Sequence, residues 1–167
     1  ARDMTDPSPA VLDWLGRLVA LDTTSRDSNL PLIDLVAGHA RGLGLPVGVF
    51  PDADAIKANL LITVPDADGR TEGGVMLSGH SDVVPTDGQP WTSDPYTLTA
   101  RDGLLYGRGT SDMKGFNAVV IAALERLAGT ALTEPVHVAL SYDEEVGCLG
   151  ARPLVESLAS AGIAPRV

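Results

Sequence analysis

The chain has 167 residues, of which 44% are hydrophobic and 20% charged, a composition typical of one folded domain and unlike that of a disordered chain. Its 22 acidic and 12 basic residues give a formal net charge of −10, which argues against nucleic acid or an anionic membrane as a partner. The longest apolar stretch, residues 118–124, is far shorter than the roughly 20 residues of a membrane-spanning helix.

Helices and short strands alternate along the first half of the chain. Ser8 followed by Pro9 is typical of an N-cap and first helical position, and apolar residues at helical spacing then predict a helix. A second helix is expected from near Pro31, with Gly44 as the glycine that ends it. Three strands are then expected, the last of them covered on both faces, at residues 47–50, 59–64 and 75–78.

The second half predicts a hairpin, a long helix that Ser111 can cap, a buried strand and a final helix, at residues 96–106, 112–127, 136–141 and 150–159. Strands that alternate with helices indicate an α/β fold. We therefore expect three layers, with a mainly parallel sheet and helices on both faces, forming a single domain over residues 1–167.

Polar residues follow the predicted elements where such a sheet binds ligands, outside the carboxyl ends of its strands. His80 and Asp82 follow one strand, and their spacing allows Asp82 to hold the second ring nitrogen of a metal-binding His80. Asp112 lies at the start of the long helix, after a glycine-rich segment that lacks the third glycine of a dinucleotide-binding motif. A solvated strand end and an aspartate favoured by the helix dipole are the simpler interpretations.

Three adjacent carboxylates, Asp143, Glu144 and Glu145, follow the strand 136–141. Their mutual repulsion is relieved either in a solvated loop or by a divalent cation. Together with His80 and Asp112 they form the set of imidazole and carboxylate ligands found in two-metal hydrolytic sites. The combination predicts a metal-dependent hydrolase.

Three segments also resemble, in order and spacing, the metal motifs of the M20 metallopeptidase family: GHSDVVP at 79–85, GRGTSDMKG at 107–115 and SYDEEVG at 141–147. Residues 142–153 (YDEEVGCLGARP) are most similar to the acetylornithine deacetylase branch of this family. The resemblance implies a zinc-exopeptidase-like catalytic domain, of which residues 1–167 would be the N-terminal portion, without the family's lid domain.

The resemblance also implies a role for each site residue. His80 and Glu145 would each bind one of two zinc ions, and Asp112 would bridge both. Glu144 would be the general base and acid, and Asp82 would orient His80. Cobalt or manganese could replace zinc. The reaction would remove acetate from N-acetylornithine to give ornithine, a step of arginine biosynthesis, and the Asp112–Met113 peptide bond is expected to be cis.

Family enzymes are more than twice as long as this chain and carry further ligands, so the isolated chain is expected to be inactive and its metal site incomplete. The expected partner is a small N-acylated amino acid, and the full-length protein is expected to form a homodimer. Alternatives are a succinyl-diaminopimelate desuccinylase, a carboxypeptidase, or a non-catalytic metal-binding or assembly module.

Four further residues complete the expectations. Cys148 is the only cysteine, which excludes an internal disulfide and favours a cytoplasmic location, and a lone cysteine is most often a small buried residue. Lys114 is expected to pair with nearby acids. His137 is expected to be a neutral, hydrogen-bonded histidine of a buried strand, and Trp14 a packing residue of the first helix.

Overall fold

The computed structural model describes residues 7–165, so residues 1–6 and 166–167 of the expected domain lie outside the described part. The elements follow in the order α1 (Pro9–Val19), α2 (Leu30–Gly42), β1 (Val47–Pro51), β2 (Ala58–Val64), β3 (Val75–His80), β4 (Thr99–Arg101), β5 (Leu104–Tyr106), α3 (Lys114–Ala128), β6 (Val136–Ser141) and α4 (Ala151–Ser160). No helix within residues 7–165 is both long and apolar enough to cross a membrane.

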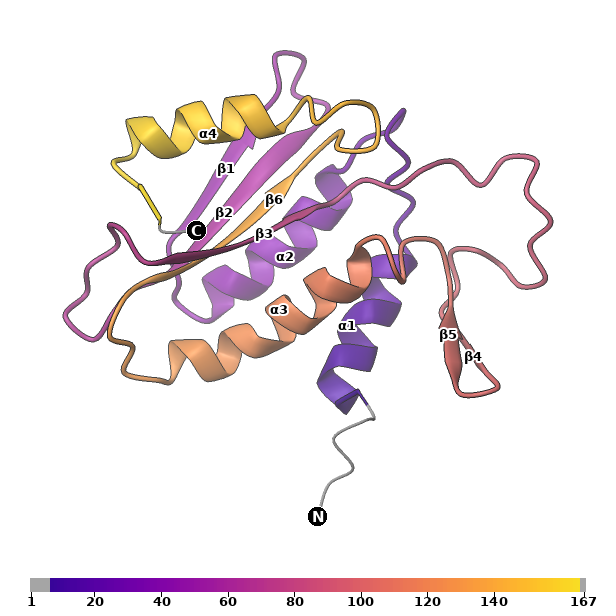
Figure 1. The fold of residues 1–167 in the computed structure, drawn as a ribbon, viewed down its shortest axis with the longest axis horizontal. Helices are drawn as coiled ribbons and strands as arrows, with labels where there is room; N and C mark the ends of the chain where they lie inside the picture. The colour runs from indigo at the N-terminus through magenta and orange to yellow at the C-terminus, as the bar shows by residue number, and fades with distance from the viewer. Residues whose placement is uncertain (1–6, 166–167) are drawn as a thin grey trace.

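The main sheet has the strand order β1-β2-β6-β3, and β4 and β5 form a separate hairpin (Figure 1). Among the strands of this sheet within residues 7–165, β3 and β6 alone pair in parallel, whereas β2 pairs antiparallel with both β1 and β6. The expectation of a mainly parallel sheet was therefore wrong in this respect. The connection between β1 and β2 contains no helix, and a short connection of this kind suits an antiparallel hairpin, while parallel strands need a long crossover. Such a crossover, containing α3, joins β3 to β6.

Helices cover both faces of this sheet, which confirms the three-layer α/β class. On one face α2 and α3 pack against the strands and α1 packs against α3, while α4 lies on the opposite face (Figure 1). The larger core includes Leu18, Ile33 and Ile121 from helices α1 to α3, and the smaller one includes Leu154 of α4. Burial of each such side chain contributes about 1.5–3 kcal/mol to stability.

Local sequence signals account for several element ends. The Ser8 hydroxyl accepts a hydrogen bond from the Val11 amide at 3.3 Å, which confirms the N-cap of α1. Gly44 has a φ of 75°, the left-handed conformation expected of a glycine just past a helix. The assignment of Ser111 as a helix cap was wrong, because α3 begins at Lys114 after Met113.

Strand β3 is less buried than its apolar sequence predicts. It lies at an edge of the described sheet with β6 as its neighbour, and Val75 at its start is 38% exposed. Burial increases toward its carboxyl end, where Gly79 and His80 are both buried. The expectation that residues 75–78 are covered on both faces was therefore wrong, because none of the four is buried.

His137 in β6 and Trp14 in α1 have the predicted packing roles. Trp14 is 5% exposed and its ring meets that of His39 edge-on, with centroids 4.8 Å apart. His137 is fully buried, with Nδ1 3.0 Å from the Thr63 hydroxyl and Nε2 3.0 Å from the Gly73 carbonyl oxygen. A neutral ring satisfies both contacts when Nε2 donates to Gly73 and the Thr63 hydroxyl donates to Nδ1.

Burial lowers the pKa of His137, outweighing its hydrogen bond to Gly73. Below pH ~6.5 the unfolded chain therefore binds a proton that the folded chain does not. The free energy of unfolding should decrease as the pH is lowered, by up to about 1.4 kcal/mol per pH unit. We expect His137→Gln to remove this component, as measured by urea unfolding at pH 7.5 and 5.5. An unchanged difference between the two pH values in the variant would contradict the assignment.

Candidate metal centre

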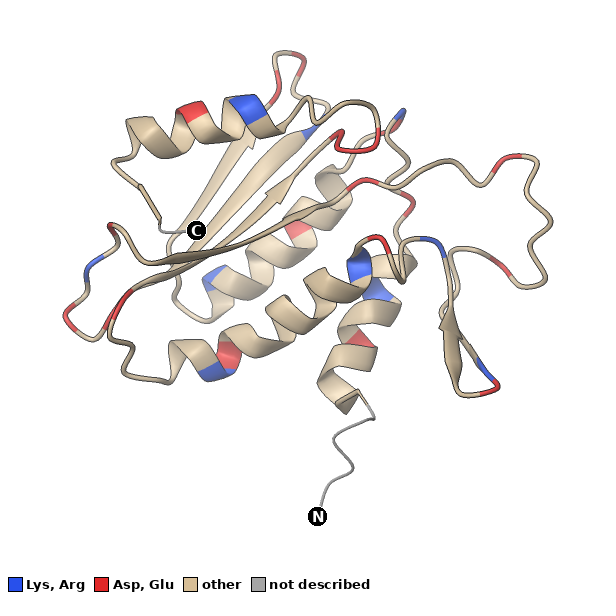
Figure 2. Cartoon of the chain, in the orientation of Figure 1, with Lys and Arg blue, Asp and Glu red and all other residues tan. Residues whose placement is uncertain are grey.

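The parallel pairing of β3 and β6 brings the predicted site residues together. In its register His80 lies opposite Ser141, so the segments that follow both strands emerge at the same edge of the sheet. Figure 2 shows acidic residues in these segments and in the turn that precedes α3. The Asn117 side chain of α3 donates a hydrogen bond to the His80 carbonyl oxygen at 2.7 Å, which ties the first turn of this helix to the end of β3.

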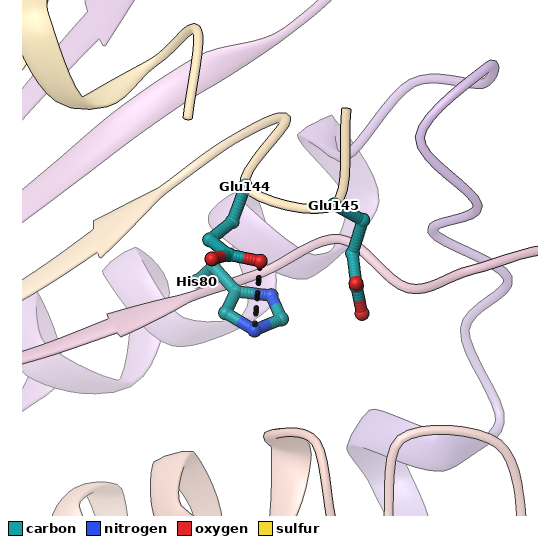
Figure 3. A group of neighbouring side chains, drawn as sticks. All are labelled: His80, Glu144 and Glu145. Carbon is teal, nitrogen blue, oxygen red and sulfur yellow. Dashed lines mark ion pairs between the residues drawn. The ribbon is translucent and has the colours of Figure 1, made fainter. Parts of the chain in front are cut away.

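His80 lies at the centre of this cluster. Its Nε2 is 3.0 Å from Asp112 Oδ1 and 3.8 Å from Glu144 Oε2. Ligand atoms of His80, Glu144 and Glu145 all lie within 4.8 Å of one another, and the three side chains come from adjacent segments (Figure 3). Residues from three separate parts of the sequence thus meet around one imidazole.

Asp112 occupies the turn before α3, and its peptide bond to Met113 is cis, as the family resemblance implied. The Asp112 side chain is 73% exposed and contacts His80, although it is not part of the three-residue group that lies within 4.8 Å. Its place just before the N-terminus of α3 is electrostatically favourable for a carboxylate.

Asp82 contacts both His80 and the 143–145 turn. His80 Nδ1 is 3.0 Å from the Asp82 carbonyl oxygen and 3.5 Å from its carboxylate Oδ1. The same carboxylate accepts hydrogen bonds from the backbone amides of Glu144 at 3.1 Å and Glu145 at 3.2 Å. The sequence predicted only the contact with His80. The contacts with the amides of Glu144 and Glu145 join residues 62 and 63 positions apart, and no sequence pattern indicates contacts over such a separation.

The charges of the cluster shift one another's pKa values. Burial lowers the pKa of His80, but hydrogen bonds to Asp82 and Asp112 outweigh it and raise the pKa to about 9. Burial raises the pKa of Asp82, yet its hydrogen bonds with His80, Ser25 and two backbone amides lower it to about 2. The pKa of Glu145 is raised by burial and by the neighbouring charge of Asp112. A cation that binds here must displace the His80 proton and would relieve the repulsion among the carboxylates.

The donor set suits a divalent metal. One imidazole nitrogen and several carboxylate oxygens face one another, and zinc accepts this mixture of nitrogen and oxygen ligands. The surrounding contacts also orient the ligands, since Asp82 holds His80 and the glutamate backbone. The residues present therefore fit a zinc-type centre.

Two sequence expectations near the site were wrong. Cys148 is exposed, because it belongs to the turn after Glu145, and its Sγ is 3.7 Å from Glu144 Oε1. Lys114 is fully buried, and its ammonium donates to the Leu21 carbonyl oxygen at 2.6 Å, whereas no ion pair joins it to an acid within the described residues 7–165. Burial lowers the pKa of Lys114 to about 8, although the charge of Asp22 partly opposes this shift.

Sequence reasoning also missed two residues beside the cluster. Lys57 forms an ion pair with Asp143, with Nζ 2.6 Å from Oδ1, and both side chains are largely buried. The Ser25 hydroxyl donates to Asp82 Oδ2 at 2.6 Å. Neither residue lies in a recognisable motif, so the sequence alone offered no signal for them.

Solved structures that are similar to this chain include a dipeptidase and a metallo-carboxypeptidase. The chain is similar to human carnosine dipeptidase 1, with a TM-score of 0.75 and 27% identity over 93% of this chain and 37% of that one. It also resembles the M20 family metallo-carboxypeptidase of Sulfolobus solfataricus in fold, with a TM-score of 0.78 at 17% identity over 94% of this chain and 36% of that one.

The sequence identifies the family. Residues 76–166 match the model of peptidase family M20/M25/M40, and the chain belongs to that family. Acetylornithine deacetylase of Pasteurella multocida is 41% identical over 155 residues, and that of Klebsiella pneumoniae (strain 342) is 45% identical over 131 residues. These matches cover 89% and 78% of this chain but 40% and 33% of the relatives, so the chain spans well under half of their length.

Proposed function

We propose that this chain carries the metal-binding part of an amide hydrolase that converts N-acetylornithine to ornithine and acetate. The observation that carries the proposal is the convergence of His80, Glu144 and Glu145 within 4.8 Å, inside the segment 76–166 that matches the family model. Relatives that are more than 40% identical are named acetylornithine deacetylase, which favours this substrate. The corresponding place in metabolism is arginine biosynthesis in the cytoplasm.

Each residue of the cluster has a distinct task in this proposal. His80 and Glu145 would each bind one of two ions, zinc in the first instance and cobalt or manganese as substitutes, and Asp112 would be shared by both. Bound divalent ions supply Lewis-acid chemistry and bring the pKa of water toward neutrality. Asp82 keeps Nδ1 of His80 engaged, so that Nε2 faces the cluster.

Glu144 is the residue that would move protons. Its side chain is 44% exposed and lies 3.8 Å from His80 Nε2, so it can reach both the cluster and a substrate in solvent. Its carboxylate would accept a proton from the attacking water and pass it to the amine nitrogen that leaves. For this role the Glu144 carboxylate must lie close to the metal ligands and remain free of the metal, so that it can exchange protons.

We further propose that catalysis requires parts of the protein beyond this chain, since it spans 40% or less of its relatives, and that the complete protein is a homodimer. The first experiment is the intact mass of the natural gene product, followed by assays of that product and of the 167-residue chain. The expected result is a product more than twice as heavy as the chain, with hydrolysis only by the longer form. Rapid hydrolysis by the chain alone would contradict this proposal.

The second candidate function is that of a peptidase, because the fold is similar to that of a metallo-carboxypeptidase. Values of kcat/KM for N-acetylornithine, N-succinyl-diaminopimelate and an unblocked dipeptide would separate the candidates in the complete protein. We expect N-acetylornithine to be preferred. Preference for the succinylated substrate or the dipeptide would replace the proposed substrate. Zinc binding without any turnover would favour a metal-binding or assembly module.

A further inference from the structure

The turn that carries both glutamates is anchored by a buried ion pair. Lys57, just before β2, places its ammonium 2.6 Å and 2.8 Å from the two carboxylate oxygens of Asp143. The two side chains are 14% and 10% exposed. Asp143 directly precedes Glu144 and has a φ of 55°, so the residue that the ion pair anchors is the first of the turn and has a left-handed conformation.

The same ammonium continues to a second segment. Lys57 Nζ donates to the backbone carbonyl oxygen of Ser25 at 2.5 Å. Ser25 is 7% exposed, and its hydroxyl donates to Asp82 Oδ2 at 2.6 Å, while its amide donates to the Val83 carbonyl oxygen at 3.1 Å. Lys57 therefore links the 143–145 turn to the segment that holds the Asp82 carboxylate.

Asp82 closes this set of contacts. Its carboxylate accepts the amides of Glu144 and Glu145, the two residues that follow Asp143. Contacts thus run from Lys57 to Asp143, along the turn to Asp82, and through Ser25 back to Lys57. We call this set of four side chains, Ser25, Lys57, Asp82 and Asp143, the anchoring ring.

We propose that Ser25 and Lys57 are positioning residues of the metal centre, which hold the 143–145 turn against His80 through Asp82 and Asp143. This inference rests on the proposed function. The contacts found for Ser25 and Lys57 join them to Asp82 and Asp143, not to the donor atoms of His80, Glu144 or Glu145. Their effect on a bound cation would therefore be indirect.

The charges of the ring explain why two donors are needed. Asp143 is the first residue of a turn whose next two residues, Glu144 and Glu145, are also acids. Asp82 places a further carboxylate beside this turn, and both aspartates are largely buried. Hydrogen bonds from an ammonium and a hydroxyl stabilise such carboxylates, and ionised partners make these bonds stronger than neutral ones. Without Ser25 or Lys57, a carboxylate would have to rotate toward solvent and release its hold on the turn.

The test compares Ser25→Ala and Lys57→Met with the unchanged sequence, each in the complete protein that contains this chain. Zinc affinity is measured at fixed pH by competition with a chromophoric chelator, and amide hydrogen exchange at Glu144 and Glu145 is measured without metal. We expect zinc to bind about 10–100-fold more weakly in both variants, the range usual for residues that orient metal ligands. The two amides should exchange at least several-fold faster, while Ser25→Thr and Lys57→Arg should restore most of both properties.

Two matched controls separate positioning from general stabilisation. Ser28→Ala removes a hydroxyl of the same loop that donates to Ile56, and Arg70→Met removes the partner of Asp66 in a remote ion pair. Neither should change zinc affinity or the two exchange rates. If Lys57→Met does not fold, Lys57→Gln combined with Asp143→Asn replaces the ion pair by neutral groups, and the same loss of affinity is expected.

The outcomes distinguish this inference from the proposed function. If Ser25→Ala and Lys57→Met lower the unfolding free energy but leave zinc affinity and amide exchange like those of the controls, the positioning role is wrong. If the complete protein that contains this chain binds no zinc, the proposed metal centre fails, while the exchange rates of Glu144 and Glu145 still report whether the anchoring ring holds the turn.

Discussion

Glu144→Gln should strongly slow the amide hydrolysis proposed for the protein that contains this chain while leaving its zinc content unchanged. Glutamine keeps the size of the side chain but cannot accept a proton from water and return it to the leaving amine. General acid–base groups contribute about 10²–10⁴-fold to rate, so kcat should fall by a factor in this range with little change in KM. Steady-state kinetics together with zinc analysis of the purified variant test both parts.

The matched variants assign the tasks of the two glutamates. Glu145→Gln and His80→Ala should lower zinc affinity and activity together, because both residues are proposed to bind metal. Glu156→Gln, in α4, removes an exposed acid that pairs with Arg152, and it should leave both properties intact. The comparison of Glu144→Gln with Glu145→Gln is needed because Glu144, the proposed proton carrier, also lies in ion-pair range of His80, a proposed metal ligand. Loss of zinc in Glu144→Gln, with retention in Glu145→Gln, would exchange their roles.

Local signals in the sequence predicted most elements to within a few residues. The Ser8–Pro9 start of α1 and the glycine after α2 follow from backbone and capping preferences, which involve only near neighbours. Strand pairing was less predictable. Whether β2 lies parallel or antiparallel to β6 depends on contacts between residues more than 70 positions apart, and the alternation of helices and strands concealed the antiparallel hairpin of β1 and β2.

The candidate site likewise contains some residues that local sequence patterns indicate and others that only the folded chain reveals. His80 and Asp112 could be proposed because each lies at the end or start of a predicted element, where ligands are usual. Ser25 and Lys57 could not, since a serine in a loop and a lysine before a strand are ordinary surface residues until the fold buries them. Cys148 illustrates the reverse case, because its apolar character suggested burial while its place in the turn after Glu145 exposes it.

Asp82→Ala should combine a loss of stability with a loss of zinc affinity. The Asp82 residue is 2% exposed and its carboxylate accepts hydrogen bonds from the Ser25 hydroxyl and from the amides of Glu144 and Glu145. Its removal leaves the buried Ser25 hydroxyl and the two partly buried amides without that acceptor, and a buried unpaired donor costs about 1–3 kcal/mol. We expect a decrease of about 2–5 kcal/mol in the free energy of unfolding, measured in urea at pH 7.

The pH dependence of this loss identifies the carboxylate as its source. Hydrogen bonds lower the pKa of Asp82 to about 2 from an ordinary value of 3.8, so between these values the unfolded chain binds more protons than the folded one. The stabilisation by Asp82 is therefore fully present above pH ~4 and is lost as the pH falls toward 2. Asp82→Ala should lack this acid-dependent step, whereas Asp68→Ala, a change at a surface residue, should retain it. If Asp82→Ala weakens zinc binding but leaves stability at pH 7 unchanged, the carboxylate orients His80 without holding the 143–145 turn, and the anchoring ring is not a structural unit.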